Sequence, residues 1–149
     1  MRITTDTNVL VSAFIAKQGH PARLLEAILT LEDMHLILSR PILRKLGEAL
    51  MREEVRARFP YTERDVDILV NTLSRSAKIA QLKSHFKIVK EDPKDNIIVN
   101  TAYDAKADYI VSGDGHLLRL GRFKGSRIVK PKQMLEIISR KFPEIVVRL

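Results

Sequence analysis

The sequence predicts an α/β fold of three layers, in which helices cover both faces of a parallel sheet. Short runs of branched apolar residues alternate with amphipathic segments along the whole chain. This alternation is typical of parallel strands joined by helical crossovers. The sequence contains no internal repeat, linker or low-complexity tract. Its 149 residues suit one domain, residues 1–149, long enough to bury about 70% of the surface of the unfolded chain.

Five strands are expected, each a short apolar run followed by turn or capping residues. Ligands of an open parallel sheet bind outside the carboxyl ends of its strands, so these ends are where a functional site is expected. The expected strands cover residues 2–5, 35–39, 87–89, 109–113 and 127–129.

Helices are expected between the strands, where apolar residues recur at intervals of three and four. Proline marks the first turn of several of them, as at Pro21, Pro41 and Pro131. The helix from Pro21 should turn Leu24, Leu25, Ile28 and Leu29 inward. The expected helices cover residues 8–15, 21–32, 41–51, 63–79, a segment that starts near residue 93, 116–120 and a last segment from residue 131.

The stretch EDPKDNIIVNTAYD, residues 91–104, places a carboxylate at the start of a buried helical face. Pro93 fits the first turn, with Asp92 as the N-cap. The apolar stripe of Ile98, Val99 and Ala102, counted back by one turn, reaches Asp95. Burying a charge is costly without a compensating partner, so Asp95 is a candidate functional residue.

Composition limits the compartment and the kind of partner. There is no cysteine, which excludes disulfides and thiolate metal sites and fits a reducing compartment. No apolar stretch is long enough to span a membrane, and the N-terminus lacks the pattern of a signal peptide. We therefore expect a soluble, cytoplasmic protein with no membrane partner.

Positive charge favours a polyanionic partner. Lys and Arg outnumber Asp and Glu by 26 to 18, which gives a net charge of +8. Residues 115–135 contain no acid but six Arg and Lys residues, among them Arg119, Arg122 and Lys124. A solvated basic surface would leave the same pattern, and abundant charge is also a trait of thermostable proteins.

Three aspartates follow the expected strands. Asp6 ends the first strand, Asp95 follows the third at a helix start, and Asp114 ends the fourth. Each could be only a helix N-cap, because aspartate is favoured there. Glu48 is a weaker candidate, since Arg44 and Arg52 stand four residues to either side and an ordinary surface ion pair would explain it.

If the carboxylates converge, cations must screen their repulsion. Oxygen ligands suit Mg²⁺ or Mn²⁺, whereas the lack of cysteine and the scattered histidines argue against zinc. Metal ions in a carboxylate cluster beside a basic surface suggest phosphodiester hydrolysis, with the basic segment holding the phosphates of a nucleic acid.

Three motifs, in order and at suitable separations, resemble the PIN-domain ribonucleases: TDTNVLVSAF near the start, EDPKDN before a helix and ADYIVSGDGHLL after it. The resemblance runs from residue 2 to about 140. It is closest to small single-domain members that include toxins of type II toxin–antitoxin (VapC-like) systems. It implies a PIN-like fold with a five-stranded parallel sheet in the order 3-2-1-4-5, metal-dependent cleavage of RNA, a cognate antitoxin and a homodimer.

The resemblance also implies roles for individual residues. Asp6, Glu48, Asp95 and Asp114 match the four acids that hold the metal and catalyse. Asn8 and Ser112 match polar positions that support the first and fourth acids through hydrogen bonds. His116 stands where many members have a further aspartate, and it could contact a phosphate or lie unused in its short helix. The missing acid leads to the hypothesis that one metal ion is bound at rest and a second arrives with the substrate. Candidate contacts to the substrate are His116, Arg119, Arg122 and Lys124.

Other functions remain open from the sequence. A catalytically silent nucleic-acid-binding domain on the same fold would keep the basic segment, and a housekeeping RNA-processing nuclease would share the acids of a toxin. A phosphatase of the haloacid-dehalogenase type also has an aspartate after its first strand, but Asn8 stands where its second aspartate is needed. A response-regulator receiver would need paired acids after that strand, and they are absent.

Overall fold

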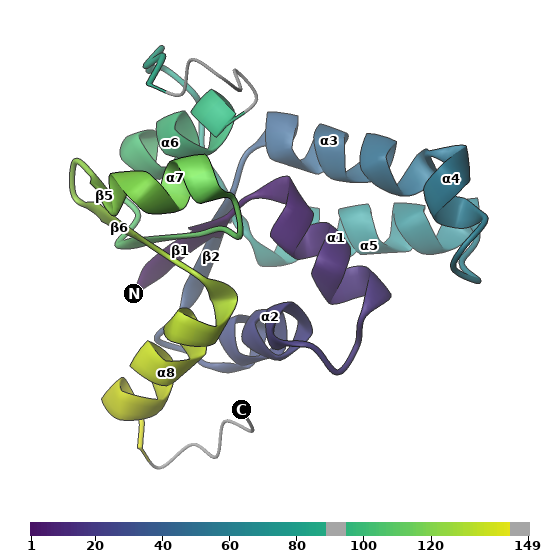
Figure 1. Ribbon diagram of the computed structural model, residues 1–149, viewed down its shortest axis with the longest axis horizontal. Helices are drawn as coiled ribbons and strands as arrows, with labels where there is room; N and C mark the ends of the chain where they lie inside the picture. Colours follow the sequence, from purple (N-terminus) through teal and green to yellow (C-terminus); the bar gives the residue numbers. More distant parts are fainter. Residues whose placement is uncertain (89–94, 144–149) are drawn as a thin grey trace.

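A six-stranded sheet in the order β3-β2-β1-β4-β6-β5 forms the centre of the computed structural model, which describes residues 1–88 and 95–143 apart from the side chain of residue 95 (Figure 1). β1 is central and pairs in parallel with β2 and with β4. β3 and β6 extend the sheet in parallel on either side, and β5 pairs with β6 in the antiparallel sense. The strands are Arg2–Thr5 (β1), His35–Leu38 (β2), Lys78–Ile79 (β3), Tyr109–Val111 (β4), Arg122–Phe123 (β5) and Ser126–Val129 (β6).

Helices cover the sheet on both faces, as the sequence predicts. In Figure 1, α6 and α7 lie on one side of the strands, and α2 and α8 lie on the other. α1 packs against α2 and α3, while α6 crosses β1, β2 and β4. No helix in the described ranges is long and apolar enough to cross a lipid bilayer. The helices are Thr7–Ile15 (α1), His20–Thr30 (α2), Arg40–Met51 (α3), Glu53–Arg56 (α4), Glu63–Ser76 (α5), Asp95–Asp104 (α6), Gly115–Leu120 (α7) and Pro131–Lys141 (α8).

The register brings three strand ends to one edge. Thr5 lies opposite Val111, and Val111 lies opposite Val129. The backbone continues this pairing beyond the strands, because the Asp6 amide donates to the Val111 carbonyl at 3.1 Å and the Ser112 amide donates to the Val129 carbonyl at 3.0 Å. The residues that follow β1, β4 and β6 therefore lie side by side.

The predicted α/β class and the strand order 3-2-1-4-5 are confirmed, with β6 as the fifth parallel strand and β5 as an additional antiparallel edge strand. The identity of the third strand was wrong. β3 is Lys78–Ile79, at the end of the segment expected to be helical from 63 to 79, and α5 stops at Ser76. The C-cap Ala77 is extended, which lets Ile79 pair with Leu38 of β2.

Residues 87 and 88 of the predicted strand 87–89 belong to no strand, and residue 89 lies outside the described ranges. The described contact of this pair is with a side chain of α6 and not with a neighbouring strand. The Ile88 amide donates to the Asn96 side chain at 2.8 Å. The predicted cap at Asp92 and the first-turn Pro93 also lie outside the described ranges.

The core agrees with most of the predicted inward faces. Ile98, Val99 and Ala102 of α6 are buried, as expected from their spacing. In α2, Leu24 and Ile28 are buried, but Leu29 is 43% exposed, so its predicted inward position was wrong. α2 packs against α1 and α8, and the buried residues of its packed face are Leu24 and Ile28.

Candidate active site at the carboxyl edge of the sheet

Asp6 is held in place by three elements at the carboxyl edge of the sheet. It follows β1 directly and is the N-cap of α1, where its Oδ1 accepts a hydrogen bond from the Val9 amide at 2.9 Å. Its own amide is bound to Val111 of β4. The hydroxyl of Ser112, just after β4, donates to Oδ2. The carboxylate is therefore fixed by contacts from α1 and β4.

Ser112 links Asp6 to Asp114. Its side chain is fully buried, and its oxygen also accepts a hydrogen bond from the Asp114 amide at 3.0 Å. The Ser112 hydroxyl thus donates a hydrogen bond to the Asp6 carboxylate and accepts one from the backbone of Asp114. Ser112 was predicted to support Asp114, and it contacts the backbone amide of Asp114 while its hydroxyl donates to the carboxylate of Asp6. Its role in the site stays a prediction.

The pKa of the Asp6 carboxyl is raised above its ordinary value. Burial is the largest cause, and the negative charge of Asp114 raises the pKa further. The hydrogen bonds from Ser112 and from the amides of Val9 and Asn8 act in the opposite direction without fully offsetting burial. The environment of Asp6 thus disfavours its negative charge, which a bound cation would stabilise.

Asn8 supports Asp6 through its backbone amide rather than through its side chain. Its side chain is exposed and makes no hydrogen bond within the described ranges. The amide is a group that any amino acid except proline would supply, so a supporting role of the Asn8 side chain stays a prediction.

Asp114 is the N-cap of α7, and His116 lies beside it. Oδ1 of Asp114 accepts hydrogen bonds from the amides of His116 at 2.8 Å and Leu117 at 3.3 Å. The His116 Nδ1 is 3.9 Å from the same oxygen, so a protonated imidazole would pair with this carboxylate. The structure thus places His116 at the fourth acid, and contact with a phosphate stays a prediction.

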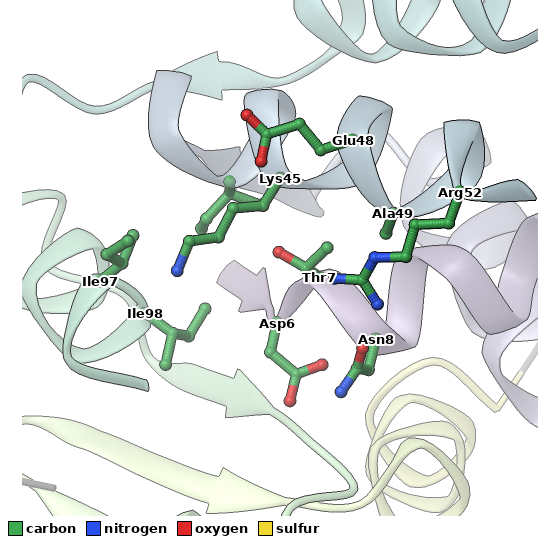
Figure 2. A pocket seen from close by; sticks show the side chains of 10 residues that line it. Asp6, Thr7, Asn8, Lys45, Glu48, Ala49, Arg52, Ile97 and Ile98 are labelled. Atoms are coloured by element: carbon green, nitrogen blue, oxygen red, sulfur yellow. The ribbon is translucent and has the colours of Figure 1, made fainter. Parts of the chain in front are cut away.

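A cavity of about 300 Å³ opens beside Asp6, between the start of α1, α3 and the first turn of α6 (Figure 2). Two cations line it, Lys45 and Arg52, and in Figure 2 both extend toward the side on which Asp6 lies. The full lining is Asp6, Thr7, Asn8, Ile42, Lys45, Glu48, Ala49, Arg52, Ile97 and Ile98. The cavity therefore combines carboxylates with positive charge.

Sequence reasoning missed Lys45 and considered Arg52 only as an ion-pair partner of Glu48. The signal was present, because Lys45, Glu48 and Arg52 are spaced by three and four residues and so share one face of a helix. Within the described ranges Glu48 forms no ion pair with Arg44 or Arg52. The surface ion pair that would have explained Glu48 is therefore not present.

Glu48 lines the cavity but does not approach Asp6. Its side chain is exposed, and in Figure 2 its carboxylate is turned away from Asp6. Asp95 begins α6, whose residues Ile97 and Ile98 line the same cavity, while the side chain of Asp95 lies outside the described part of the structure. The assignment of both acids to the site stays a prediction.

The basic candidates lie at different distances from the acids. The Nε of Arg119 donates to the Gly115 carbonyl at 3.1 Å, which brings this side chain back to the first residue of α7, the residue after Asp114. Arg122 begins β5, and Lys124 is in the turn between β5 and β6. That turn precedes β6, whereas Ser112 is beside the last residue of β6, so Lys124 is at the opposite end of the strand from the acids.

The fold and this edge define an α/β protein that brings carboxylates together where its parallel strands end. Residues 2–116 match the PIN domain family, and the chain belongs to that family. PIN domains are generally nucleases.

Two comparisons place the chain among known proteins. It is 30% identical over 120 residues to an uncharacterized protein of Methanocaldococcus jannaschii, a match that covers 80% of this chain and 75% of the relative. Its fold resembles the crystal structure of VapBC2 from Rickettsia felis bound to a DNA fragment from their promoter. The TM-score is 0.58 at 14% identity, over 87% of this chain and 98% of the other. At that identity the likeness concerns the fold alone.

Proposed function

We propose that the chain is a metal-dependent endoribonuclease that hydrolyses phosphodiester bonds of RNA. The observation that carries this proposal is the state of Asp6: a carboxylate with a raised pKa, next to Asp114, at the mouth of a cavity lined by Lys45 and Arg52. Negative groups that favour a cation, beside positive groups that favour a phosphate, suit the chemistry of a nuclease.

The residues at the edge fit Mg²⁺ or Mn²⁺. Asp6 and Asp114 offer only oxygen ligands, which hard divalent ions prefer. Among the side chains that the structure describes, no three acids or histidines lie close enough together to hold an ion. The proposed site therefore consists of Asp6 and Asp114, completed by Asp95 at the start of α6 and by Glu48 after a change of side-chain rotamer.

When bound, such an ion supplies activation of water and neutralises charge on the phosphate. In this proposal some residues orient the Asp6 carboxylate and others bind the phosphates of the RNA. Ser112 and the Val9 amide fix the two oxygens of Asp6, so that its carboxylate keeps one orientation. Lys45 and Arg52 attract the phosphates on the cavity side, and Arg119 does so near Asp114.

The biological setting proposed is that of a toxin in a cytoplasmic toxin–antitoxin pair. The motifs that resemble VapC-like toxins and the fold likeness to VapBC2 support this setting. A cognate antitoxin and a homodimer belong to the same proposal. A housekeeping RNA-processing nuclease would use the same site, and a small antitoxin reading frame next to the gene would favour the toxin.

A second candidate is a nucleic-acid-binding domain without catalysis. Two observations favour it: Glu48 is turned away from Asp6, and His116 stands where many family members have another acid. Binding of RNA and of Mn²⁺ without any cleavage would support this candidate.

The deciding experiment is the cleavage of end-labelled structured and unstructured RNAs with Mg²⁺, Mn²⁺ or EDTA. The wild type is compared with Asp95→Asn and with Asp67→Asn, which changes an exposed acid on α5. Cleavage that needs metal, is lost in Asp95→Asn and survives in Asp67→Asn would support the nuclease. Equal cleavage by all three proteins would show that the assignment of Asp95 is wrong.

A further inference from the structure

Residues 83–88 run along α6 and are held by three of its side chains. The Asn100 side chain binds both backbone groups of Phe86: its Oδ1 accepts from the Phe86 amide at 2.8 Å, and its Nδ2 donates to the Phe86 carbonyl at 3.1 Å. Asn100 is buried, so these bonds are shielded from water. The side chain of Asn100 thus replaces a neighbouring strand for Phe86.

Asn96 and Asp104 hold the two ends of the same segment. Asn96 accepts from the Ile88 amide, and Asp104 accepts from the amides of Lys83 and Ser84 at 2.7 and 3.0 Å and from the Ser84 hydroxyl. Although burial raises the pKa of Asp104, the hydrogen bonds from Ser84 and Lys83 lower it below the ordinary value. The carboxylate is therefore held in its charged form by the segment.

The spacing of these contacts explains why the segment is extended. Four residues of an α-helix rise by about 6.0 Å, and two residues of extended chain by about 6.6 Å. Positions 96, 100 and 104 can therefore meet positions 88, 86 and 84 in turn. The segment runs antiparallel to α6, and its Ile88 end is bound to Asn96, which directly precedes Ile97 and Ile98 in the lining of the cavity beside Asp6.

The inward side of the segment is fixed by an aromatic cluster. The Phe86 ring makes edge contacts with Tyr103 of α6 and Phe123 of β5, with ring centroids 4.8 and 5.2 Å apart. The Nζ of Lys124 lies 5.6 Å from the centre of the Phe86 ring. Hydrogen bonds and packing together leave the segment little freedom to rotate.

The outward side carries Lys83, His85 and Lys87, which we call the basic row. These three side chains are exposed, while Ser84 and Phe86 between them are partly buried. Alternate residues of an extended chain stand about 6.6 Å apart on one side. In the described ranges no carboxylate forms an ion pair with the row, although Lys83 is near enough to Asp104 to help lower its pKa.

We propose that the basic row binds successive phosphates of a single-stranded stretch of RNA that leads into the acidic edge. The proposal rests on the nuclease function proposed above and adds the surface along which its substrate would lie. The row is straight, regularly spaced and held by α6, and its Lys87 end is nearest the start of α6. A flexible single strand can follow such a row through its phosphates. A duplex is rigid and divides its phosphates between two strands.

The test measures RNA binding by fluorescence anisotropy in EDTA, so that cleavage plays no part. An unstructured 12-nucleotide RNA and a duplex of the same sequence are titrated at several salt concentrations. The proteins are the wild type, the double variant Lys83→Gln/Lys87→Gln and the control Lys17→Gln/Lys141→Gln, which removes two exposed lysines elsewhere. For the single strand, removing two phosphate contacts should reduce the slope of log K against log salt by about 1.4.

We expect the row variant to bind the single strand about tenfold more weakly at low salt, with the control variant unchanged. An unchanged slope in the row variant, an equal loss in the control variant, or a wild type that binds no RNA would each overturn the proposal. If the row variant binds the duplex more weakly by the same factor, the preference for single-stranded RNA would be overturned. The row would then attract any RNA through its charge alone.

Cleavage assays separate this proposal from the nuclease proposal. If the row variant has a reduced salt slope but the wild type cuts no RNA, the proposal for the basic row stands and the nuclease proposal is wrong. If cleavage depends on metal but the salt slopes of RNA binding are equal in all three proteins, the nuclease proposal stands and the proposal for the basic row is wrong.

Discussion

The Ser112 hydroxyl donates to the Asp6 carboxylate across 106 positions of sequence, and the same oxygen accepts from the Asp114 amide. This contact connects the end of β1 with the end of β4, where Asp6 and Asp114 lie. Ser112→Ala should therefore affect both stability and the metal site.

Ser112→Ala leaves the Asp114 amide without its partner, which costs about 1–3 kcal/mol of unfolding free energy. Loss of a residue that orients a metal ligand typically weakens metal affinity about 10–100-fold. Denaturant unfolding in EDTA and calorimetry with Mn²⁺ would measure the two effects. Ser74→Ala, at an exposed position on α5, is the control. Unchanged Mn²⁺ affinity in Ser112→Ala would count against a metal site at Asp6.

Arg52→Gln should weaken the binding of RNA more than it slows the chemical step. Arg52, the C-cap of α3, lines the cavity, and we expect its positive charge to attract the RNA phosphates equally in the bound substrate and in the transition state. We expect KM to rise about tenfold with kcat nearly unchanged, because the lost contact would stabilise the bound substrate and the transition state equally. Arg44→Gln changes an exposed arginine outside the cavity lining and should leave both constants unchanged. A fall in kcat alone would contradict this role.

A divalent metal ion should stabilise the folded chain through Asp6 and Asp114. At a metal concentration of 100 times Kd, the expected gain is about 2.7 kcal/mol. Thermal unfolding with Mn²⁺ and with EDTA would show this gain as a higher Tm. Asp114→Asn should lose most of it, and Asp67→Asn should keep it. The same gain in both variants would place the ion elsewhere on the surface.

Asp104 should make stability depend on pH in the acidic range. Its pKa in the folded chain is below the ordinary value of 3.8, so the folded state binds this proton less readily than the unfolded state. Its contribution is therefore present above pH 3.8 and is lost as the pH falls through the lower, folded pKa.

Asp104→Asn should consequently be less stable than the wild type at neutral pH, and the difference should shrink as Asp104 of the wild type becomes protonated. Urea unfolding at a series of pH values measures the difference. Asp33→Asn, at an exposed position before β2, is the control. A difference that stays constant down to the lowest pH would mean that the charge of Asp104 contributes nothing.

Much of the fold could be predicted because local pattern and tertiary role agree. The apolar runs at β1, β2, β4 and β6 are bounded by capping or turn residues, and the positions of Asp6 and Asp114 follow from the strand ends. β3 was hidden because Lys78 and Ile79 directly follow the helical stripe of α5. Nothing in that stripe signals that Ile79 pairs with Leu38.

The segment before α6 could not be assigned for a different reason. A sequence pattern in which polar and apolar residues alternate indicates an extended backbone. It does not indicate which groups accept the hydrogen bonds of the backbone amides. In residues 83–88 the amides of Ser84, Phe86 and Ile88 donate to side chains of α6, so residues 87 and 88 do not pair with a strand as predicted. Lys45 was missed because a lysine in an amphipathic helix is ordinarily solvated.

Both borders of the sheet are unsuited to adding another strand. β3 and β5 are two residues long, and Arg122 of β5 lies opposite Arg127 of β6, so a chain that approached there would meet adjacent positive charges. Short and charged borders of this kind discourage the edge-to-edge pairing that leads to aggregates. Any assembly of this chain with itself or with an antitoxin should therefore use its helices, and a continuous intermolecular sheet should not form.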